Sequence, residues 1–455
     1  MAAGTRGMPR ARRRSELGLL LVGAITVVSA LLLLSLSRTS RLPADLAPFA
    51  GTALAIIVVL QLVHRRIAPH ADPVLVPVAL VLNGIGYVMI DRVDPAAAGQ
   101  QLAWTLVGLG VYVAVLAALR RSRDLERYRY LLAVLALVLL VSPLAPLVGE
   151  NINGARLWVH LGSMEFQPVE VAKLLLVVFF ASYFVEKREL LTIPTRRIGD
   201  RLAPDLRAFG PVAVAGVVSL LVILAEHDIG FSLILFVVFL AMIWVATGRW
   251  TYLAIGLAAF AVGTFLASHL LGQVNERIEL WLDPWRYMTG PQLGYQPVQG
   301  EIAFGRGGLF GTGLGLGLGA GVIPYATSDF VFAVIGEELG LVGTAAVLVA
   351  YLLLVGSGLR AALRARSEFA RLVAVGLTAT LGFQSFFIMA GVVRLLPLTG
   401  VTLPFVSYGG SSLVANYALL ALVMRISDEG NQPAVPPRPA ASSTEGAAVM
   451  GAGTR

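Results

Sequence analysis

Residues 229–247 read IGFSLILFVVFLAMIWVAT and contain no charged side chain. An α-helix of this length spans about 30 Å, the thickness of the hydrocarbon core of a bilayer. The run is continuously apolar and does not alternate, so it favours a membrane helix over a strand of a membrane barrel. We therefore predict a transmembrane α-helix here.

Similar apolar stretches recur along the whole chain, and twelve of them are long enough to cross a bilayer. They lie near residues 17–36, 46–63, 74–90, 101–119, 131–148, 168–186, 208–224, 229–247, 250–271, 329–356, 370–392 and 405–425. Composition agrees, because 57% hydrophobic and 14% charged residues exclude a soluble protein of this length. The predicted fold is all-α, a polytopic membrane helix bundle of about 12 transmembrane helices.

The basic residues indicate how this bundle is oriented. They gather at both termini and in the loops near Arg65, Arg120–Arg129, Lys187–Arg207 and Arg360–Arg371. Because cytoplasmic loops carry the excess of Lys and Arg, we predict that these loops and both termini are cytoplasmic. The polar stretch 272–328 is then predicted to lie on the extracytoplasmic side.

The two ends of the chain differ from the helical part. Residues 1–16 form a basic N-terminus, and the apolar run after them is too long for a signal peptide, so we expect an uncleaved first helix. Residues 429–455 are rich in Pro, Ala, Gly and Ser and are predicted to be a disordered cytoplasmic tail. The absence of cysteine excludes disulfides, thiolate metal sites and cysteine nucleophiles. The net charge of +8 reflects the cytoplasmic bias, and no pattern indicates nucleic-acid binding.

Three predicted outer segments contain the unusual polar residues, and the first runs from Asn151 to Lys173. Pro168 suits the first turn of the sixth helix, and Glu170 and Lys173 follow one turn apart on the same face. Ionisable residues at this depth usually face a cavity or each other. Glu170 and Lys173 are therefore candidate site residues.

The second segment, 272–328, carries the cluster Trp281-Leu282-Asp283-Pro284-Trp285. Acids are sparse in it, while arginines such as Arg277 and Arg286 place positive charge beside the membrane surface. This mixture suits chemistry on a lipid-borne, anionic substrate. The glycine run 305–317 lacks the G-x-G-x-x-G spacing of dinucleotide sites, so tight turns and close backbone approach explain it better.

Asp329 and the pair Glu337-Glu338 follow this segment, and the pair enters the tenth helix about two turns deep. Carboxylates inside a membrane helix are a functional hypothesis by default. A satisfied structural network is the alternative, and the sequence leaves both open.

The third segment, Arg394 to Ser412, combines prolines, glycines and several Ser and Thr hydroxyls. Such a backbone can break a helix at membrane depth only where it lines a cavity buried in protein, so we predict a re-entrant or broken element. No G-x-S-x-G elbow accompanies its serines, which disfavours a serine nucleophile.

Six groups of residues together resemble the motifs of the SEDS family (shape, elongation, division and sporulation), whose members include RodA, FtsW and SpoVE. The resemblance covers roughly residues 75–428. The groups are Asn153-Gly154-Ala155 with Trp158; Phe166-Gln167-Pro168 with Glu170 and Lys173; Asp228-Ile229-Gly230; Gly294-Tyr295-Gln296; Ser328-Asp329-Phe330 with Glu337-Glu338-Leu339-Gly340; and Pro397 to Ser412.

The resemblance implies a peptidoglycan glycosyltransferase of the bacterial cytoplasmic (plasma) membrane, which polymerises lipid II at the outer face in cell elongation, shape or division. Its expected partners are a class B penicillin-binding protein, acting as transpeptidase, and membrane lipids. The 4-hydroxyl of an acceptor GlcNAc would displace undecaprenyl pyrophosphate, which requires a carboxylate base and positive charge for the leaving group. No cofactor is certain; a divalent cation, Mg²⁺ or Mn²⁺, could bridge the pyrophosphate, but the sequence shows no dedicated oxygen cage.

By this resemblance Asp283 is the candidate catalytic base. The residues expected to bind substrate are Arg156, Trp158, Glu170, Lys173, Asp228, Arg277, Arg286, Tyr295, Gln296, Asp329, Glu337, Glu338, Arg394, Thr399, Ser407 and Ser411. No metal ligand is predicted.

One departure from the family pattern concerns the base. Family members commonly carry the acid assigned to catalysis a few residues later, just before the Gly-Tyr-Gln motif, whereas residues 286–293 contain no acid. Either Asp283 takes that role, or another carboxylate such as Glu279, Glu337 or Glu338 reaches in. Asp283 could instead simply cap the turn at Pro284.

Twelve helices, against the ten usual in the family, predict an extra N-terminal transmembrane pair in residues 17–73, before a SEDS core in residues 74–428. This arrangement resembles actinobacterial RodA proteins more than FtsW. Two alternatives to a glycosyltransferase remain: a non-catalytic SEDS scaffold for a penicillin-binding protein, and a lipid II flippase. The missing later acid favours the scaffold, while the lack of a second copy of the Pro397–Ser412 element disfavours a transporter.

Overall fold

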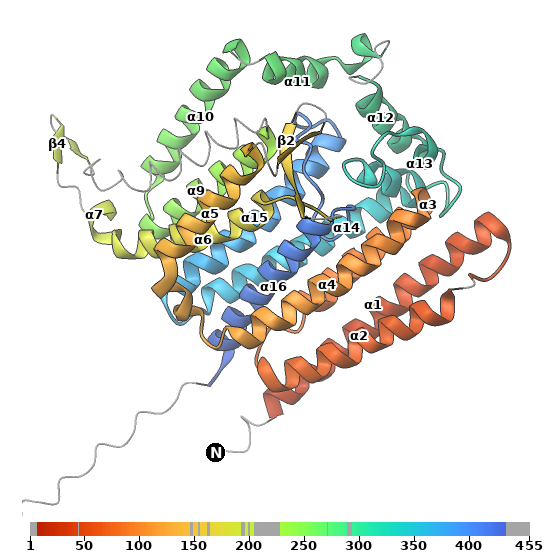
Figure 1. Cartoon of the computed structure of the whole chain (residues 1–455), viewed down its shortest axis with the longest axis horizontal. Coiled ribbons are helices and arrows are strands. Elements are labelled where there is room, and N and C mark those ends of the chain that lie inside the picture. The colour runs from red at the N-terminus through yellow and green to blue at the C-terminus, as the bar shows by residue number, and fades with distance from the viewer. Residues whose placement is uncertain are drawn as a thin grey trace, which may run out of the picture.

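The computed structural model describes residues 7–43, 45–145, 149–152, 155–161, 164–192, 196–198, 201–203, 228–270, 272–288 and 294–433. Long helices dominate this part of the chain (Figure 1). They are α1 (Gly7–Thr39), α2 (Leu46–Ile67), α3 (Leu75–Val93), α4 (Pro95–Ala118), α5 (Arg129–Val141), α6 (Val169–Glu186), α9 (Ile229–Thr247), α10 (Trp250–Leu270), α14 (Val331–Leu363), α15 (Glu368–Val392) and α16 (Gly410–Asn431).

Ten helices of the described part are long and apolar enough to cross a bilayer, and they coincide with ten of the twelve predicted spans. α6 corresponds to an eleventh predicted span and is more charged, because it contains Glu170, Lys173 and Glu186. The predicted span 208–224 and most of the predicted tail lie outside the described residues. The polytopic all-α membrane fold is thus confirmed, whereas its orientation and the domain boundaries stay predictions.

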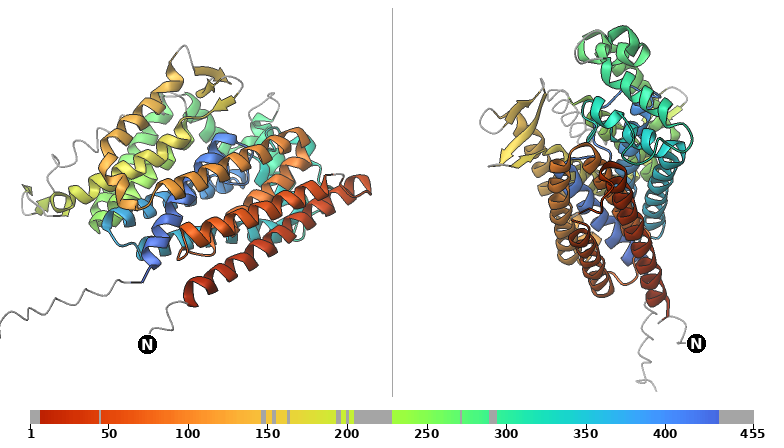
Figure 2. Two further views of the ribbon diagram at one scale, coloured as in Figure 1. Left: turned by 60° about the horizontal axis from the view of Figure 1, so that its bottom comes forward. Right: turned by 90° about the vertical axis from the view of Figure 1, so that its right-hand side faces the viewer.

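The N-terminal pair, α1 and α2, lies beside α3 and α4 (Figures 1 and 2). Two glycines allow α1 to approach α3 closely. A Cβ atom at Gly23 would lie 2.6 Å from Val81, and one at Gly84 would lie 2.3 Å from Val27. Small residues are what permits such close contact between membrane helices, so these two positions determine how α1 sits against the core.

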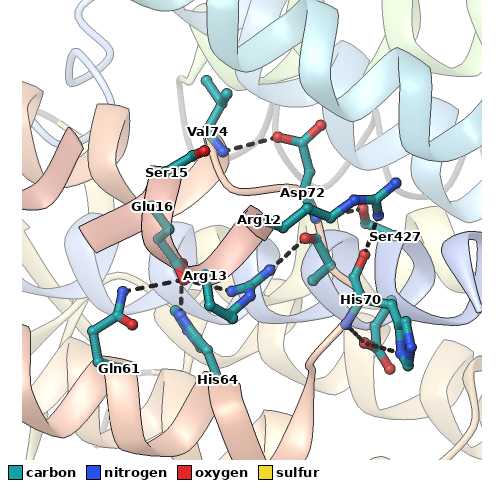
Figure 3. Close-up of polar contacts among 12 residues, drawn as sticks. Arg12, Arg13, Ser15, Glu16, Gln61, His64, His70, Asp72, Val74 and Ser427 are labelled. Atoms are coloured by element: carbon teal, nitrogen blue, oxygen red, sulfur yellow. Dashed lines mark hydrogen bonds and ion pairs between the residues drawn. The ribbon is translucent and has the colours of Figure 1, made fainter. Parts of the chain in front are cut away.

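Buried polar side chains join the pair to the core near the start of α1 (Figure 3). Glu16 is fully buried and accepts hydrogen bonds from Arg13 at 2.5 Å and from Gln61 at 3.3 Å. Its other carboxylate oxygen lies 2.7 Å from His64 Nδ1, and His64 Nε2 lies 2.8 Å from the hydroxyl of Tyr112 in α4. Charges inside a membrane protein persist when they are paired in this way.

The loop between α2 and α3 contacts the last helix. The backbone N–H of His70 donates to Asp428 at 2.7 Å, and that of Asp72 donates to Ser427 at 3.0 Å, both partners being in α16. Arg13 of α1 donates to the carbonyl of Ala71 in the same loop (Figure 3). The first and last helices of the bundle are therefore tied together at this end.

The predicted outer segments are folded. Residues 149–152, 155–161 and 164–166 form a three-stranded antiparallel sheet, with order β1-β2-β3, that the sequence did not predict. The stretch 272–328 contains three helices and a 3₁₀ turn, of which α12 packs on α14. The bounds of the shorter elements are β1 (Gly149–Ile152), β2 (Ala155–Leu161), β3 (Met164–Phe166), β4 (Arg196–Ile198), β5 (Arg201–Ala203), α7 (Arg188–Thr192), α11 (Gly272–Leu282), α12 (Tyr295–Gly307), α13 (Gly319–Val322), η1 (Ser122–Tyr128), η2 (Ser142–Leu144) and η4 (Pro284–Tyr287).

The third segment, between α15 and α16, has the irregular backbone that its prolines and glycines predict. Arg394 and Phe405 have positive φ angles of 58° and 68°, which non-glycine residues rarely adopt. Val401, Leu403, Phe405 and Val406 are nonetheless buried. Residues 401–407 therefore run through the protein interior, whereas Leu395 and Gly400 nearer the start of the segment are exposed.

Candidate active site

The predicted pair in α6 forms a buried ion pair. Lys173 Nζ lies 2.5 Å from Glu170 Oε2, as their spacing on one helical face predicts. Lys173 also donates to Gln384 of α15 at 2.7 Å, and Gln384 donates to the carbonyl of Thr402 at 2.9 Å. The second carboxylate oxygen of Glu170 is buried and has no hydrogen-bond partner among the described residues. The α6 pair is thus connected to the third segment.

A second polar group lies at the start of α9. Asp228 caps this helix and accepts a hydrogen bond from the backbone N–H of Phe231 at 3.0 Å. Burial raises the pKa of Asp228 to about 6, although the nearby Arg277 guanidinium acts in the opposite direction. Lys173 lies 5.1 Å from the centre of the Phe231 ring, so this group adjoins the α6 pair.

Arg277 of α11 connects Asp228 to the third segment. Its Nη1 donates to the carbonyls of Leu398 and Thr399 at 3.0 and 3.1 Å. A Cβ at Gly400 would lie 3.9 Å from Arg277 Nη2 and 4.0 Å from Asp329 Oδ2, which places both charged groups beside the same backbone.

Asp329, which precedes α14, resembles Asp228 in its environment. Burial raises its pKa to about 6 as well, against the opposing effect of Arg277. The hydroxyl of Thr399 is buried and without a hydrogen-bond partner among the described residues. The structure thus brings together four predicted substrate-binding residues that are far apart in sequence: Asp228, Arg277, Asp329 and Thr399.

Asp283 lies on the surface, at the end of α11. Its Oδ1 accepts a hydrogen bond from the backbone N–H of Arg286 at 3.3 Å, so Asp283 caps the turn η4. The sequence left open that Asp283 caps the turn at Pro284, and the structure shows this cap. This cap uses one of the two carboxylate oxygens of Asp283. Asp283 lies six residues beyond Arg277, which corresponds to about 9 Å along a helix at 1.5 Å per residue. A capping role and a catalytic role are therefore compatible in position.

Arg394 holds the end of α11 to α12. Its Nη1 forms an ion pair with Glu301 at 2.7 Å, and its carbonyl accepts a hydrogen bond from Trp281 Nε1 at 3.2 Å. The guanidinium is thus already paired, whereas Arg286 is exposed on the capped turn. Arg286 is the better placed of the two to meet an incoming anion.

The carboxylates of Glu337 and Glu338 are buried in α14 and bind the glycine segment, residues 308–319. Glu337 accepts from the backbone N–H groups of Leu318 and Gly319 at 3.1 and 2.6 Å. Glu338 accepts from Gly315 N–H at 2.9 Å and from Arg92 Nε at 2.8 Å. Glu337 and Glu338 thus form a structural hydrogen-bond network, which is one of the two interpretations that the sequence leaves open.

The remaining predicted site residues are dispersed. Ser407 Oγ donates to the carbonyl of Ser328 at 2.6 Å and fixes the third segment, and Ser411 is buried in the first turn of α16. Tyr295 and Gln296 begin α12. Arg156 and Trp158 lie in β2; of these two, the structure describes the side chain of Trp158 only.

Two partners were missed from the sequence, Gln384 and Arg92. Each is more than 200 residues from its partner, with separations of 211 and 246. No local spacing could indicate these contacts; the only signal was a polar residue inside an apolar helix run.

The donor set does not suit a resident metal ion. Mg²⁺ and Mn²⁺ prefer a shell of oxygen ligands, and the guanidinium of Arg277 beside Asp228 and Asp329 repels a cation. Among the described residues, no three His, Asp or Glu side chains gather in a way that could hold one.

The FtsW/RodA/SpoVE family model, described as "Cell cycle protein", matches residues 74–432. The chain belongs to this family. The match begins directly before α3, so α1 and α2 both precede the matched region.

Curated SEDS relatives are similar over most of the chain. The "Peptidoglycan glycosyltransferase RodA" of Mycobacterium tuberculosis is 41% identical over 433 residues, covering 93% of this chain and 92% of that protein. The residues that this alignment leaves out are fewer than those of α1 and α2 together. The alignment therefore includes at least part of this N-terminal pair. The "Probable peptidoglycan glycosyltransferase FtsW" of Geobacter sulfurreducens is 34% identical and covers 78% of this chain and 95% of that protein.

Solved SEDS structures share the fold. A chain from the study "Structural coordination of polymerization and crosslinking by a peptidoglycan synthase complex" has a TM-score of 0.65 at 28% identity, covering 80% of this chain and 99% of that one. Thermus thermophilus RodA has a TM-score of 0.57 at 28% identity, covering 80% and 98%.

Proposed function

We propose that this protein is a peptidoglycan glycosyltransferase that polymerises lipid II at the outer face of the cytoplasmic membrane. Family membership and the mycobacterial RodA relatives support the activity. The observation that supports the site is the cluster of Asp228, Arg277 and Asp329, with the exposed Asp283 six residues beyond Arg277 at the end of α11.

In the proposed reaction the 4-hydroxyl oxygen of the acceptor GlcNAc attacks C1 of the donor sugar. The bond from C1 to the pyrophosphate oxygen breaks, undecaprenyl pyrophosphate leaves with the bond's electron pair, and the hydroxyl proton passes to a carboxylate. We assign this carboxylate to Asp283, because it is exposed and one of its oxygens is free of the turn's hydrogen bond. The exposed Arg286 on the same turn would stabilise the leaving negative charge.

The buried part of the site would then bind the substrate. The buried oxygen of Glu170 and hydroxyl of Thr399 lack hydrogen-bond partners among the described residues, so we assign them to polar groups of the sugars, while Arg277 and Lys173 hold these elements in place. Groups fixed before substrate arrives contribute most to catalysis, because no energy is needed to reorganise them.

Two substitutions of Asp283 separate catalysis from capping. Asparagine keeps the cap, because its side-chain oxygen accepts the same hydrogen bond, but it cannot take a proton. Alanine loses both. If Asp283 is the base, Asp283→Asn and Asp283→Ala should both lower lipid II polymerisation by at least about a hundredfold while the protein stays folded.

The matched control is Asp94→Asn, because Asp94 is an exposed cap of α4 that accepts from Ala96 and Ala97. It should polymerise as the wild type does. If Asp283→Asn is active and Asp283→Ala is inactive, Asp283 serves only as a cap. The catalytic base would then be Asp228 or Asp329. A wild type that fails to polymerise lipid II with every candidate transpeptidase would leave only the scaffold role.

A class B penicillin-binding protein is the proposed partner. The support is the similarity to a chain of a peptidoglycan synthase complex. Co-purification of the full-length protein with candidate transpeptidases, followed by the polymerisation assay, tests this part separately from Asp283.

A further inference from the structure

A cavity lies between the N-terminal pair and the core, apart from the candidate active site. Its volume is about 90 Å³, and nearly all its lining side chains are apolar, among them Leu20, Val27, Ile56 and Leu80. An apolar cavity of this kind stays dry and binds apolar groups. The volume fits a short length of hydrocarbon chain and excludes a whole lipid.

The side chains of Thr52, Asn83 and Thr105, three of the polar residues in the lining, already have hydrogen-bond partners. Thr105 donates to Asn83 Oδ1 at 3.0 Å, and Asn83 Nδ2 donates to the carbonyl of Phe405 at 3.2 Å. Binding there would depend on apolar contact alone.

Four membrane helices surround the cavity. α1 contacts α2 and α3, α4 contacts α2 and α3, and the four thus form a ring. The glycine contacts between α1 and α3 and the buried Glu16 network hold the pair in this place (Figure 3). Some of the lining residues, including Ala24, Ala53 and Ile56, are partly exposed on helices that span the membrane. The exposed parts of these residues therefore face the lipid of the bilayer.

Charged groups lie at the end of the ring where α1 and α3 finish and α2 begins. Tyr87 lines the cavity and stacks on Phe49 with ring centres 5.0 Å apart, and Asp91 follows one turn later in α3. Asp91 lies within electrostatic range of Arg38 and Asp45, and Arg38 Nη1 donates to the Asp91 carbonyl at 3.5 Å. Arg38 and Asp45 are exposed.

This end therefore offers the carboxylates of Asp45 and Asp91 and the guanidinium groups of Arg38 and Arg41 to a lipid headgroup. A headgroup with a phosphate and an ammonium complements them, the phosphate meeting Arg38 and the ammonium meeting Asp45 and Asp91. A purely anionic headgroup, such as that of a polyprenyl pyrophosphate, has no cationic group to pair with these two carboxylates.

We propose that this cavity binds part of an acyl chain of a zwitterionic aminophospholipid of the phosphatidylethanolamine class, with its headgroup at Arg38, Asp45 and Asp91. The bound lipid fills the ring of α1 to α4 and forms part of the joint between the N-terminal pair and the core. This site is independent of the proposed glycosyltransferase reaction.

Photochemical labelling of the full-length protein in vesicles tests the proposal. The probe is phosphatidylethanolamine with a diazirine in its acyl chain, and labelled residues are mapped by mass spectrometry. Labelling should concentrate on the residues of α1 to α4 that line the cavity. Ala53→Phe fills the cavity and should lower labelling there about tenfold, equivalent to about 1.4 kcal/mol. The control Ala55→Phe makes the same change on the lipid-facing side of α2 and should leave cavity labelling intact.

Further labelling experiments test recognition of the lipid headgroup. Phosphatidylglycerol with the same photoactive chain, and a photoactive undecaprenyl phosphate, should label the cavity several-fold less, and Asp45→Asn with Asp91→Asn should remove this preference. Unlabelled phosphatidylethanolamine should compete better than phosphatidylglycerol on the wild type, a result that needs no variant. Equal labelling in Ala53→Phe, equal competition by the two phospholipids, or preferred labelling by the undecaprenyl probe would each overturn the proposal.

Discussion

Beside Arg277, Asp228 is buried and Asp329 is partly buried, whereas Asp283 is exposed. Burial raises the pKa of each to about 6. A carboxylate with this pKa is largely ionised at neutral pH yet holds a proton more readily than an ordinary aspartate, which suits a general base. These two residues are therefore the reserve candidates if Asp283 only caps its turn.

Substituting Asp228 with asparagine should flatten the pH dependence of stability. The folded-state pKa of about 6 lies above the ordinary 3.8, so the folded state binds this proton more tightly than the unfolded state does. The corresponding stability is present below about pH 4 and is lost as the pH rises to about 6. Asparagine still caps α9 but does not titrate. Thermal unfolding midpoints between about pH 4 and 7 should therefore fall less in Asp228→Asn than in the wild type.

Asp94→Asn, at the exposed cap of α4, is the matched control and should leave the pH slope of the wild type unchanged. Parallel slopes for the wild type and Asp228→Asn would contradict a buried Asp228 with a raised pKa.

At the same scale, local spacing predicted some contacts and missed others. Glu170 and Lys173 are three residues apart in one helix, so their ion pair was readable from the sequence. Gln384 and Arg92 come from distant helices, and only tertiary packing brings them to Lys173 and Glu338. Asp283 had two consistent interpretations, and the geometry of its cap does not exclude the catalytic one.

At the scale of elements, the conformation of the glycine segment, residues 308–319, depends on its contacts with α14. Gly340 interrupts α14 with φ 66°, a conformation that favours glycine, and lies against Leu309 and the N atom of Gly311. The carboxylates of Glu337 and Glu338 then bind the N–H groups of the segment. Its many glycines serve close backbone approach, as the sequence predicted.

Removing the charge of Glu338 should loosen this element. In Glu338→Gln the partly buried Arg92 loses its counter-ion, and breaking a buried pair costs about 3–5 kcal/mol. We expect a lower unfolding midpoint and faster hydrogen exchange across residues 308–319. The control Glu301→Gln breaks the more exposed pair with Arg394 and should cost less than about 1 kcal/mol. Equal losses in the two variants would argue against the network.

Element prediction worked best where a single physical requirement dominates. Continuous apolar runs matched the membrane helices because the bilayer demands about twenty apolar residues in each. The sheet of β1 to β3 and the helices α11 to α13 lie in predicted outer segments without that requirement, so periodicity did not reveal them. Their contacts with α14 and the third segment come from the folded bundle.

The orientation of the whole molecule can be tested because the chain contains no cysteine. Single cysteines introduced at the exposed residues Asn275 and Arg123 would report opposite sides of the membrane. With the predicted orientation, a membrane-impermeant maleimide should label Asn275→Cys in intact cells and should label Arg123→Cys only after lysis. The reverse pattern would invert the bundle and remove Asp283 from the outer face.

The contacts between the first and last helices bear on how the protein is made. Synthesis and membrane insertion proceed from the N-terminus, so α1 arrives with Glu16 before His64 and Tyr112 have been translated. The loop after α2 must wait longer, because Ser427 and Asp428 are among the last residues of the bundle to leave the ribosome. Completion of the chain, and not insertion of any single helix, therefore sets the moment at which the N-terminal pair locks onto the core.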